Sequence, residues 1–208
     1  MGIKVFTFDC GGVLLRDADL SRYDRWEART GLAREALRER LYSGEAWSLA
    51  ERGKLSESEF WLRVGEELGL DEEEALALQE DMWSAWAVEP TVLSLIDRLR
   101  EHYRIAMVSN ATDVLEERLA ERYGVADRFE TIVNSSRLGI PKPEEGIYEE
   151  LLRRVQVEPH EVVFIDDRAD NVTAAASMGM HVLWFVGPQE LERQLGMYLR
   201  ARMPEALR

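Results

Sequence analysis

The sequence predicts an α/β protein with a doubly wound parallel sheet and an inserted α-helical cap. Four short apolar runs rich in β-branched residues indicate central strands that are covered on both faces: Ile3 to Phe8, Ile105 to Val108, Val162 to Ile165 and Val182 to Val186. Patterns typical of helices lie between the later runs, at Thr91 to His102, Val114 to Tyr123 and Glu144 to Gln156. In such a core, ligands bind beyond the carboxyl ends of the strands.

The stretch 17–88 has helical periodicity and contains five of the six Trp residues (Trp26, Trp47, Trp61, Trp83 and Trp86). We predict that it forms a cap of four or five helices, and that residues 1–16 and 89–208 form the catalytic core. The Trp positions are interpreted as helical core of the cap rather than as an aromatic substrate cage. The acidic run Asp71 to Glu74 predicts a helix start, because carboxylates complement the dipole of a helix N-terminus.

Composition excludes several classes of partner and site. The 208 residues carry a formal net charge of −14, which argues against nucleic acid as a partner. No apolar segment approaches the roughly 20 residues that span a bilayer, and the first residues lack signal-peptide features, so we expect a cytoplasmic monomer or homodimer. The single cysteine, Cys10, excludes an intrachain disulfide and a Cys-based zinc site.

Polar residues follow the predicted strands at the points where these end. Asp9 comes directly after the first strand and precedes Gly11-Gly12, so it is a candidate nucleophile or metal ligand, or alternatively a turn cap. Ser109 and Asn110 follow the second run and suit an anion. Lys142 lies between two prolines that stiffen its loop, which makes it a fixed positive charge.

Two adjacent carboxylates, Asp166 and Asp167, end the third run. They would repel each other unless a cation neutralised them, and oxygen ligands of this kind suit Mg²⁺. Each of these strand-end residues alone could be an ordinary cap or surface residue. Their recurrence at successive strand ends favours one convergent site.

With these motifs, the chain resembles the haloacid dehalogenase-like superfamily over nearly its whole length. Asp9 matches the nucleophile of the first motif, Ser109 and Lys142 match the second and third, and the acidic pair matches the fourth. The segments FDCGGVLL, ERGKLSESEF and VFIDDRADN are similar to those of bacterial sugar-phosphate phosphatases, such as those acting on glucose 1-phosphate, and of the N-terminal phosphatase domain of soluble epoxide hydrolases.

The resemblance implies a Mg²⁺-dependent phosphatase that hydrolyses a small phosphate monoester, a sugar phosphate in particular, through an aspartyl-phosphate on Asp9. Asp9, the carbonyl of Gly11, Asp166 and Asp167 would surround the metal. Ser109, Asn110 and Lys142 would hold the phosphate and screen its charge.

One position departs from the family pattern, because many of its phosphatases carry a general-acid Asp where this chain has Gly11. A missing acid typically costs about 10²- to 10⁴-fold in rate, which favours anomeric, aryl or acyl phosphates with good leaving groups. Asp17, Asp19 and Glu51 are candidate replacements from the cap side.

Three other functions stay open at this stage. A metal-independent 2-haloacid dehalogenase shares the Asp nucleophile but lacks the acidic pair. A catalytically silent binding or regulatory protein conflicts with the intact Asp9 and Lys142, and a mutase is disfavoured by Gly11.

Few further residues suggest a role in chemistry or in specificity. Cys10 is predicted to point into the core, and no histidine is given a catalytic role. Substrate specificity is expected to reside in the cap, with these residues as candidates: Arg16, Arg22, Arg25 and Trp47.

Overall fold

A computed structural model describes residues 2–202 and contains a five-stranded parallel sheet in the order β5-β4-β1-β6-β7. Each neighbouring pair runs parallel, as the near-continuous apolar runs predict. The predicted doubly wound α/β fold is therefore confirmed. Its strands are β1 (Val5–Phe8), β4 (Arg104–Ser109), β5 (Thr131–Asn134), β6 (Val162–Asp166) and β7 (His181–Trp184).

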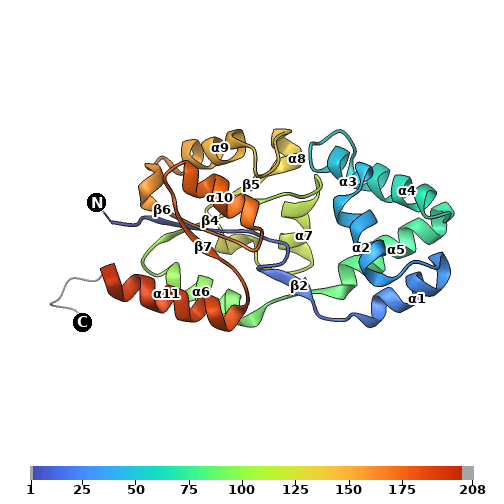
Figure 1. Ribbon diagram of the computed structural model, residues 1–208, viewed down its shortest axis with the longest axis horizontal. Coiled ribbons are helices and arrows are strands. Elements are labelled where there is room, and N and C mark those ends of the chain that lie inside the picture. The colour runs from blue at the N-terminus through green and yellow to red at the C-terminus, as the bar shows by residue number, and fades with distance from the viewer. Residues whose placement is uncertain (1, 203–208) are drawn as a thin grey trace.

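Helices cover both faces of this sheet (Figure 1). Side chains alternate along each strand, so that Phe6 and Phe8 pack on one face while Val5 packs on the other. The first face is covered by α6 (Pro90–Leu99), α7 (Leu115–Glu121) and α11 (Pro188–Arg202). The second is covered by α9 (Glu145–Val155) and α10 (Ala169–Ser177). Short helical turns complete the core: η1 (Ala126–Arg128), α8 (Ser135–Leu138) and η2 (Pro159–Glu161).

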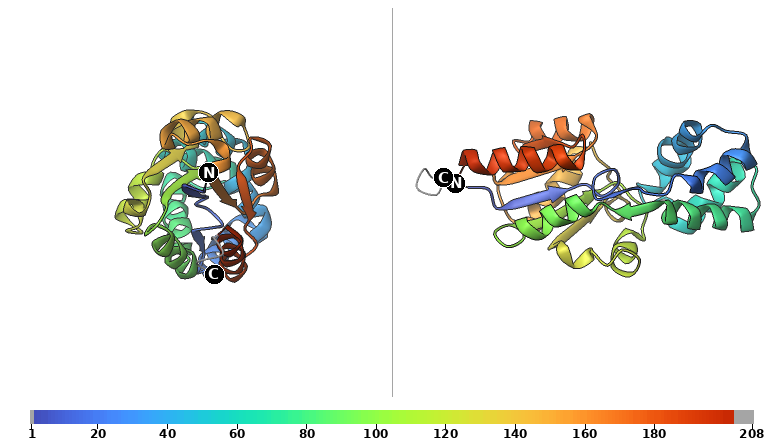
Figure 2. Two further views of the ribbon diagram at one scale, coloured as in Figure 1. Left: turned by 90° about the vertical axis from the view of Figure 1, so that its left-hand side faces the viewer. Right: turned by 90° about the horizontal axis from the view of Figure 1, so that it is seen from below.

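Five further helices form a lobe beyond the carboxyl ends of the strands (Figure 2). They enclose a hydrophobic cluster of their own, centred on the fully buried Tyr23 and Trp26. Two three-residue strands, β2 (Leu15–Asp17) and β3 (Trp86–Val88), pair antiparallel and connect the lobe to the core. The helices are α1 (Ser21–Thr30), α2 (Arg34–Ser43), α3 (Glu45–Ala50), α4 (Glu57–Glu67) and α5 (Glu72–Ala85). We call this lobe the cap.

Local sequence signals account for where the cap helices begin. Ser56 and Asp71 each accept a hydrogen bond from the backbone N–H three residues later, and a Glu at that third position completes a capping box. The predicted helix start at the acidic run is thus confirmed. Within residues 2–202, no helix combines the length and the apolar character that crossing a membrane requires.

Strand β5 and the β2–β3 pair were not among the predicted strands. Only two of the four β5 residues, Ile132 and Val133, are apolar, and β2 and β3 have three residues each, so neither produces a readable periodicity. The boundaries proposed for core and cap, at residues 16/17 and 88/89, stay a prediction. They fall within or next to the connecting strands.

The cap contacts the core through polar bonds that bridge the two lobes. The backbone N–H of Glu57 donates to Asp113 at 2.8 Å, and the Tyr123 hydroxyl donates to the Trp83 carbonyl at 3.0 Å. The lobes also approach so closely at Gly53, where φ is +67°, that a Cβ there would lie 2.1 Å from the carbonyl oxygen of Ser136. This contact requires a residue without a side chain.

Replacing Gly53 should therefore test the contact between the lobes. We expect Gly53→Ala to lower the free energy of unfolding by about 3 kcal/mol, combining left-handed backbone strain with overpacking. Gly69→Ala is the matched control, because Gly69 has φ +68° with no atom within 4 Å of its Cβ position. It should cost only about 1 kcal/mol. Urea unfolding measures both, and equal losses would contradict the close approach.

Candidate active site

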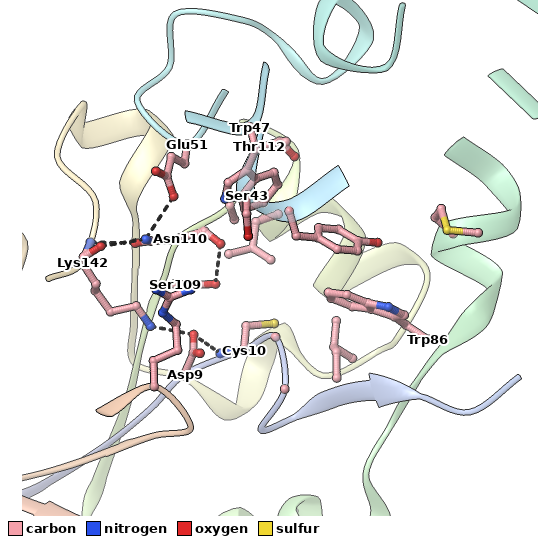
Figure 3. Close-up of a pocket in the computed structure, with 18 of the residues that line it drawn as sticks. Asp9, Cys10, Ser43, Trp47, Glu51, Trp86, Ser109, Asn110, Thr112 and Lys142 are labelled. Atoms are coloured by element: carbon pink, nitrogen blue, oxygen red, sulfur yellow. Dashed lines mark hydrogen bonds and ion pairs between the residues drawn. The ribbon is translucent and has the colours of Figure 1, made fainter. Parts of the chain in front are cut away.

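The carboxyl ends of β1, β4 and β6 face a pocket of about 330 Å³ between the core and the cap. Figure 3 shows Asp9, Ser109 and Lys142 at its floor, with Trp47 and Trp86 across from them. Of the predicted site residues, Asp9, Gly11, Ser109, Asn110, Lys142 and Asp167 line the pocket. Asp166 lies directly behind them and is fully buried.

Lys142 joins the ends of three strands. Its Nζ lies 2.7 Å from Asp9 Oδ1 and 2.7 Å from Asp166 Oδ2, and it donates to the Val108 carbonyl at 2.8 Å. An ammonium has three N–H groups, so all of them are used. Burial alone would lower the pKa of Lys142, but the two carboxylates outweigh it and raise that pKa, so the ammonium stays charged.

Asp9 is held at the floor in a fixed orientation. Its Oδ1 accepts from the Cys10 backbone N–H at 2.7 Å and pairs with Lys142. Burial raises the pKa of Asp9 to about 7, helped by Asp166 and opposed by Lys142. The carboxylate therefore needs neighbouring positive charge to be fully ionised at neutral pH.

The acidic pair after β6 divides into two environments. Asp166 accepts from Lys142, from the Arg168 backbone N–H at 2.9 Å and from Asn171 Nδ2 at 3.0 Å, so its oxygens are occupied by protein donors. Asp167 instead faces the pocket, and its Oδ2 lies where a Cβ on residue 12 would approach to 2.3 Å. Gly12, at φ +85°, thus provides the space for this carboxylate.

The loop after β4 is fastened to the lysine loop by Asn110. Its Oδ1 accepts from the Lys142 backbone N–H at 2.7 Å, and its Nδ2 donates to the Lys142 carbonyl at 2.9 Å and to Glu51 at 3.1 Å. The side chain of Asn110 therefore positions the loop, and only its backbone is left to contact an anion. Ser109 is buried, and its hydroxyl makes only a long contact of 3.4 Å to the Asn110 carbonyl.

A divalent cation fits this arrangement. Ligand oxygens of Asp9, Asp166 and Asp167 all lie within 4.8 Å of one another. Three carboxylates face one ammonium, so the cluster has an excess of negative charge, and hard oxygen donors suit Mg²⁺. The geometry favours Asp9 and Asp167 as ligands, because the oxygens of Asp166 already have partners.

An aromatic ring lies beside the position of the missing acid. A Cβ on Gly11 would lie 3.4 Å from the outer edge of the Trp86 indole, which is an ordinary van der Waals contact, so this ring borders the space of a side chain at position 11. Of the three candidate replacement acids, only Glu51 lines the pocket. Asp17 pairs with Arg38, and Asp19 pairs with Arg22 at the surface.

The predictions for the cap are partly wrong. Trp47 lines the pocket as expected, but the three arginines named with it do not: Arg22 and Arg25 pair with Asp81, and Arg16 pairs with Glu89. Trp26 is buried in the cap core as predicted, whereas Trp83 and Trp86 line the pocket because the last turn of α5 and β3 face the strand ends.

Cys10 is buried in the core cluster, as predicted, although it also touches the pocket. Burial and the neighbouring Asp9 raise the pKa of its thiol, so it stays protonated and unreactive. Among the described residues that line the pocket there is no histidine.

Sequence reasoning assigned no role to Glu57 or Asn171. Glu57 is buried and accepts from Trp61, Gln79 and Trp83 at 2.7 to 2.9 Å, and also from the Thr112 hydroxyl of the core. In the sequence it is one acidic residue among several at a helix start. Nothing in that pattern distinguishes it. Asn171 stood in the quoted acidic motif but was given no partner.

Comparisons with known proteins agree with this geometry. The model of the haloacid dehalogenase-like hydrolases matches residues 3–179. The chain is 27% identical to a sesquiterpene phosphatase of Aspergillus oryzae, covering 85% of this chain and 87% of that protein. It is 26% identical to a D-ribitol-5-phosphate phosphatase of Bacteroides thetaiotaomicron, covering 85% and 89%.

Among solved structures, a HAD family enzyme of Bacteroides thetaiotaomicron in complex with magnesium and inorganic phosphate has the same fold. The TM-score is 0.72 at 22% identity, covering 88% of this chain and 94% of that one. Several other curated relatives are longer proteins, and this chain spans less than half of their length.

Removal of the buried ammonium should show how strongly it holds the site. In metal-free buffer at pH 8, we expect Lys142→Met to lower the free energy of unfolding by about 3 to 5 kcal/mol, since it leaves buried carboxylates unpaired. Without the ammonium, the folded-state pKa of Asp9, which already exceeds its unfolded value, would rise further. As the pH falls from 8 to 5, Asp9 becomes protonated and no longer needs a positive partner, so the loss of unfolding free energy should become smaller.

Lys4→Met is the control for this measurement. Lys4 is half exposed and pairs with Glu161 at 2.7 Å, so its loss should cost less than about 1 kcal/mol and depend little on pH. A pH-independent loss in Lys142→Met would contradict the charge-pair explanation.

Proposed function

The chain belongs to the haloacid dehalogenase-like hydrolases, and from this premise we propose that it is a phosphatase of small phosphate monoesters that works through an aspartyl-phosphate on Asp9. One observation carries the proposal. A buried carboxylate at the pocket floor, Asp9, lies 2.7 Å from a buried ammonium and beside a second pocket carboxylate, Asp167. This combination supplies a nucleophile, charge screening and a cation site at one point.

The first half-reaction transfers the phosphoryl group to the protein. An Asp9 oxygen attacks phosphorus, the bond from phosphorus to the ester oxygen breaks, and the leaving alcohol takes up a proton. Lys142 screens the charge between the carboxylate and the phosphoryl oxygens. The Ser109 hydroxyl and the backbone N–H groups after β4 hold those oxygens in place.

The second half-reaction restores the enzyme. Water attacks the phosphorus of the aspartyl-phosphate, the bond to the Asp9 oxygen breaks, and inorganic phosphate leaves. Asn110 keeps the two phosphate-binding loops in register throughout, because its amide bonds both backbone groups of Lys142.

Asp9, Asp167 and the carbonyl of Gly11 are the groups that would hold Mg²⁺, with Asp166 behind them keeping Lys142 and Asn171 in place. The ion would neutralise negative charge on the carboxylates and on the phosphoryl oxygens. This clustering of acids supports a phosphatase over a metal-independent haloacid dehalogenase.

The relatives do not fix which alcohol the substrate carries. Two of them differ in polarity of the alcohol, as the names D-ribitol-5-phosphate phosphatase and sesquiterpene phosphatase state. A sugar phosphate, the cytoplasmic location and a monomeric or homodimeric state stay predictions.

The proposed chemistry is tested by release of inorganic phosphate from p-nitrophenyl phosphate and a panel of phosphate esters. Activity should require Mg²⁺, stop with chelator, and fall by at least about 10³-fold in Asp9→Asn, which removes the nucleophile. Conversion of 2-chloropropionate in the presence of chelator would support the dehalogenase instead. If neither reaction occurs, the result would favour the catalytically silent binding protein.

Glu51 is placed to act as the missing acid. Its carboxylate lines the pocket next to Asn110, and burial raises its pKa, against the effect of Arg52, so that it retains its proton to higher pH. We expect Glu51→Gln to lower kcat for alkyl phosphates by about 10²-fold and to leave p-nitrophenyl phosphate, whose leaving group needs no proton, nearly unchanged.

The exposed Asp19 provides the control, and Asp19→Asn should leave both rates unchanged. An equal loss on both substrates in Glu51→Gln would show that Glu51 has only a structural role. If wild type hydrolyses a simple alkyl phosphate as fast as an anomeric one, the leaving-group argument from Gly11 is wrong.

A further inference from the structure

Six aromatic side chains on the cap side of the pocket form one continuous series of ring contacts. Successive centroids lie 5.0 to 6.3 Å apart along Trp61, Phe60, Trp47, Tyr42, Trp86 and Trp83, and all six line the pocket. We call this series the aromatic collar. Its members Trp47 and Trp86 lie across the pocket from Asp9 and Lys142 (Figure 3).

Glu57 closes the series. The indole N–H groups at its two ends, Trp61 and Trp83, both donate to Oε1 of this carboxylate, at 2.9 and 2.7 Å. These polar atoms are therefore turned toward Glu57 and are unavailable to a ligand. Tyr42, Trp47, Trp83 and Trp86 are half-buried and present ring surface to the pocket, while the buried Phe60 and Trp61 complete the packing of the series.

The other polar groups near the collar are largely occupied as well. Thr112 donates its hydroxyl to Glu57, and Arg38 is paired with Asp17. Among the cap-side groups that line the pocket, the hydroxyls of Tyr42 and Ser43, the carboxylate of Glu51, which already accepts from Asn110, and the unpaired indole N–H of Trp86 remain. Aromatic surface therefore predominates on the cap side, and the hydroxyls of a polyhydroxylated leaving group would find few partners there.

The collar reaches the reaction centre at Gly11. The Trp86 ring approaches the Cβ position of residue 11 to 3.4 Å, so an aromatic surface begins directly beside the Asp9 loop. The leaving group of a phosphate held at Asp9 would therefore contact apolar surface from its first carbon onward.

We infer that the substrate is the phosphate monoester of an apolar alcohol or phenol, rather than of a sugar. The inference rests on the proposed phosphatase function and specifies its substrate class. It follows from the aromatic collar and from the small number of free polar groups beside it.

Two five-carbon esters test this directly, n-pentyl phosphate and D-ribitol 5-phosphate. Both are esters of a primary alcohol, and they differ in the four free hydroxyls of ribitol. We expect kcat/KM to favour the pentyl ester by about 100-fold, since burial of unpaired hydroxyls is disfavoured. A preference below about tenfold, or for the ribitol ester, would overturn the inference and leave the phosphatase function standing.

Variants of the collar give the matched comparison. Trp47→Gln should reduce the pentyl preference by about tenfold, while Trp47→Phe, which keeps an aromatic surface, should restore most of it. Leu76→Gln makes an apolar-to-polar change on the exposed surface of the cap and should leave the preference unchanged. Equal effects of all three variants would contradict a role for the collar.

A binding measurement separates failure of the inference from failure of the proposed function. n-Pentylphosphonate cannot be hydrolysed, and its binding can be followed through tryptophan fluorescence. We expect it to bind at least about tenfold more tightly than inorganic phosphate. If no ester is hydrolysed but this difference holds, the phosphatase function is wrong and the apolar ligand class stands; equal affinities would reject the ligand class.

Discussion

The contact between the Lys142 ammonium and two buried carboxylates is the constraint on which the site depends. It brings together the ends of β1, β4 and β6, because the partners of the ammonium come from all three strands. Removing charges from water costs several kcal/mol per ion unless the geometry compensates. Here each N–H of the ammonium has an acceptor, and the parallel sheet fixes where those acceptors lie. Reactivity at Asp9 and stability of the core therefore share one set of bonds.

A second constraint links the two lobes. Gly12 leaves room for the Asp167 carboxylate, and Gly11 lies within van der Waals range of the Trp86 ring. The Asp9 loop thus lies between Trp86 and the carboxylate cluster. Glu57, which bonds to residues of both lobes, adds another link between them.

Sequence reasoning predicted the sheet and the floor of the site because both depend on local pattern. Asp9, Ser109, Lys142 and Asp167 lie at or after strand ends, and a parallel sheet brings such ends together. It named Trp47 as a pocket candidate but could not predict the collar, because Trp83 and Trp86 have the spacing of helical core residues and only tertiary packing turns them toward the pocket. Strand β5 was missed since it offers two apolar residues. Glu57 was missed since most of its partners, Gln79, Trp83 and Thr112, are distant in sequence.

The two lobes have separate hydrophobic clusters, and this separation has an evolutionary consequence. The floor is supported by the clusters on either face of the sheet, whereas Phe60 and Trp61 of the collar belong to the cluster of the cap. Substitutions at Phe60 or Trp61 therefore act on the packing of the cap, whereas Trp86 packs against the clusters of both lobes. Evolution can thus alter much of the pocket wall through a lobe of about seventy residues, while the strand ends that form the floor stay as they are.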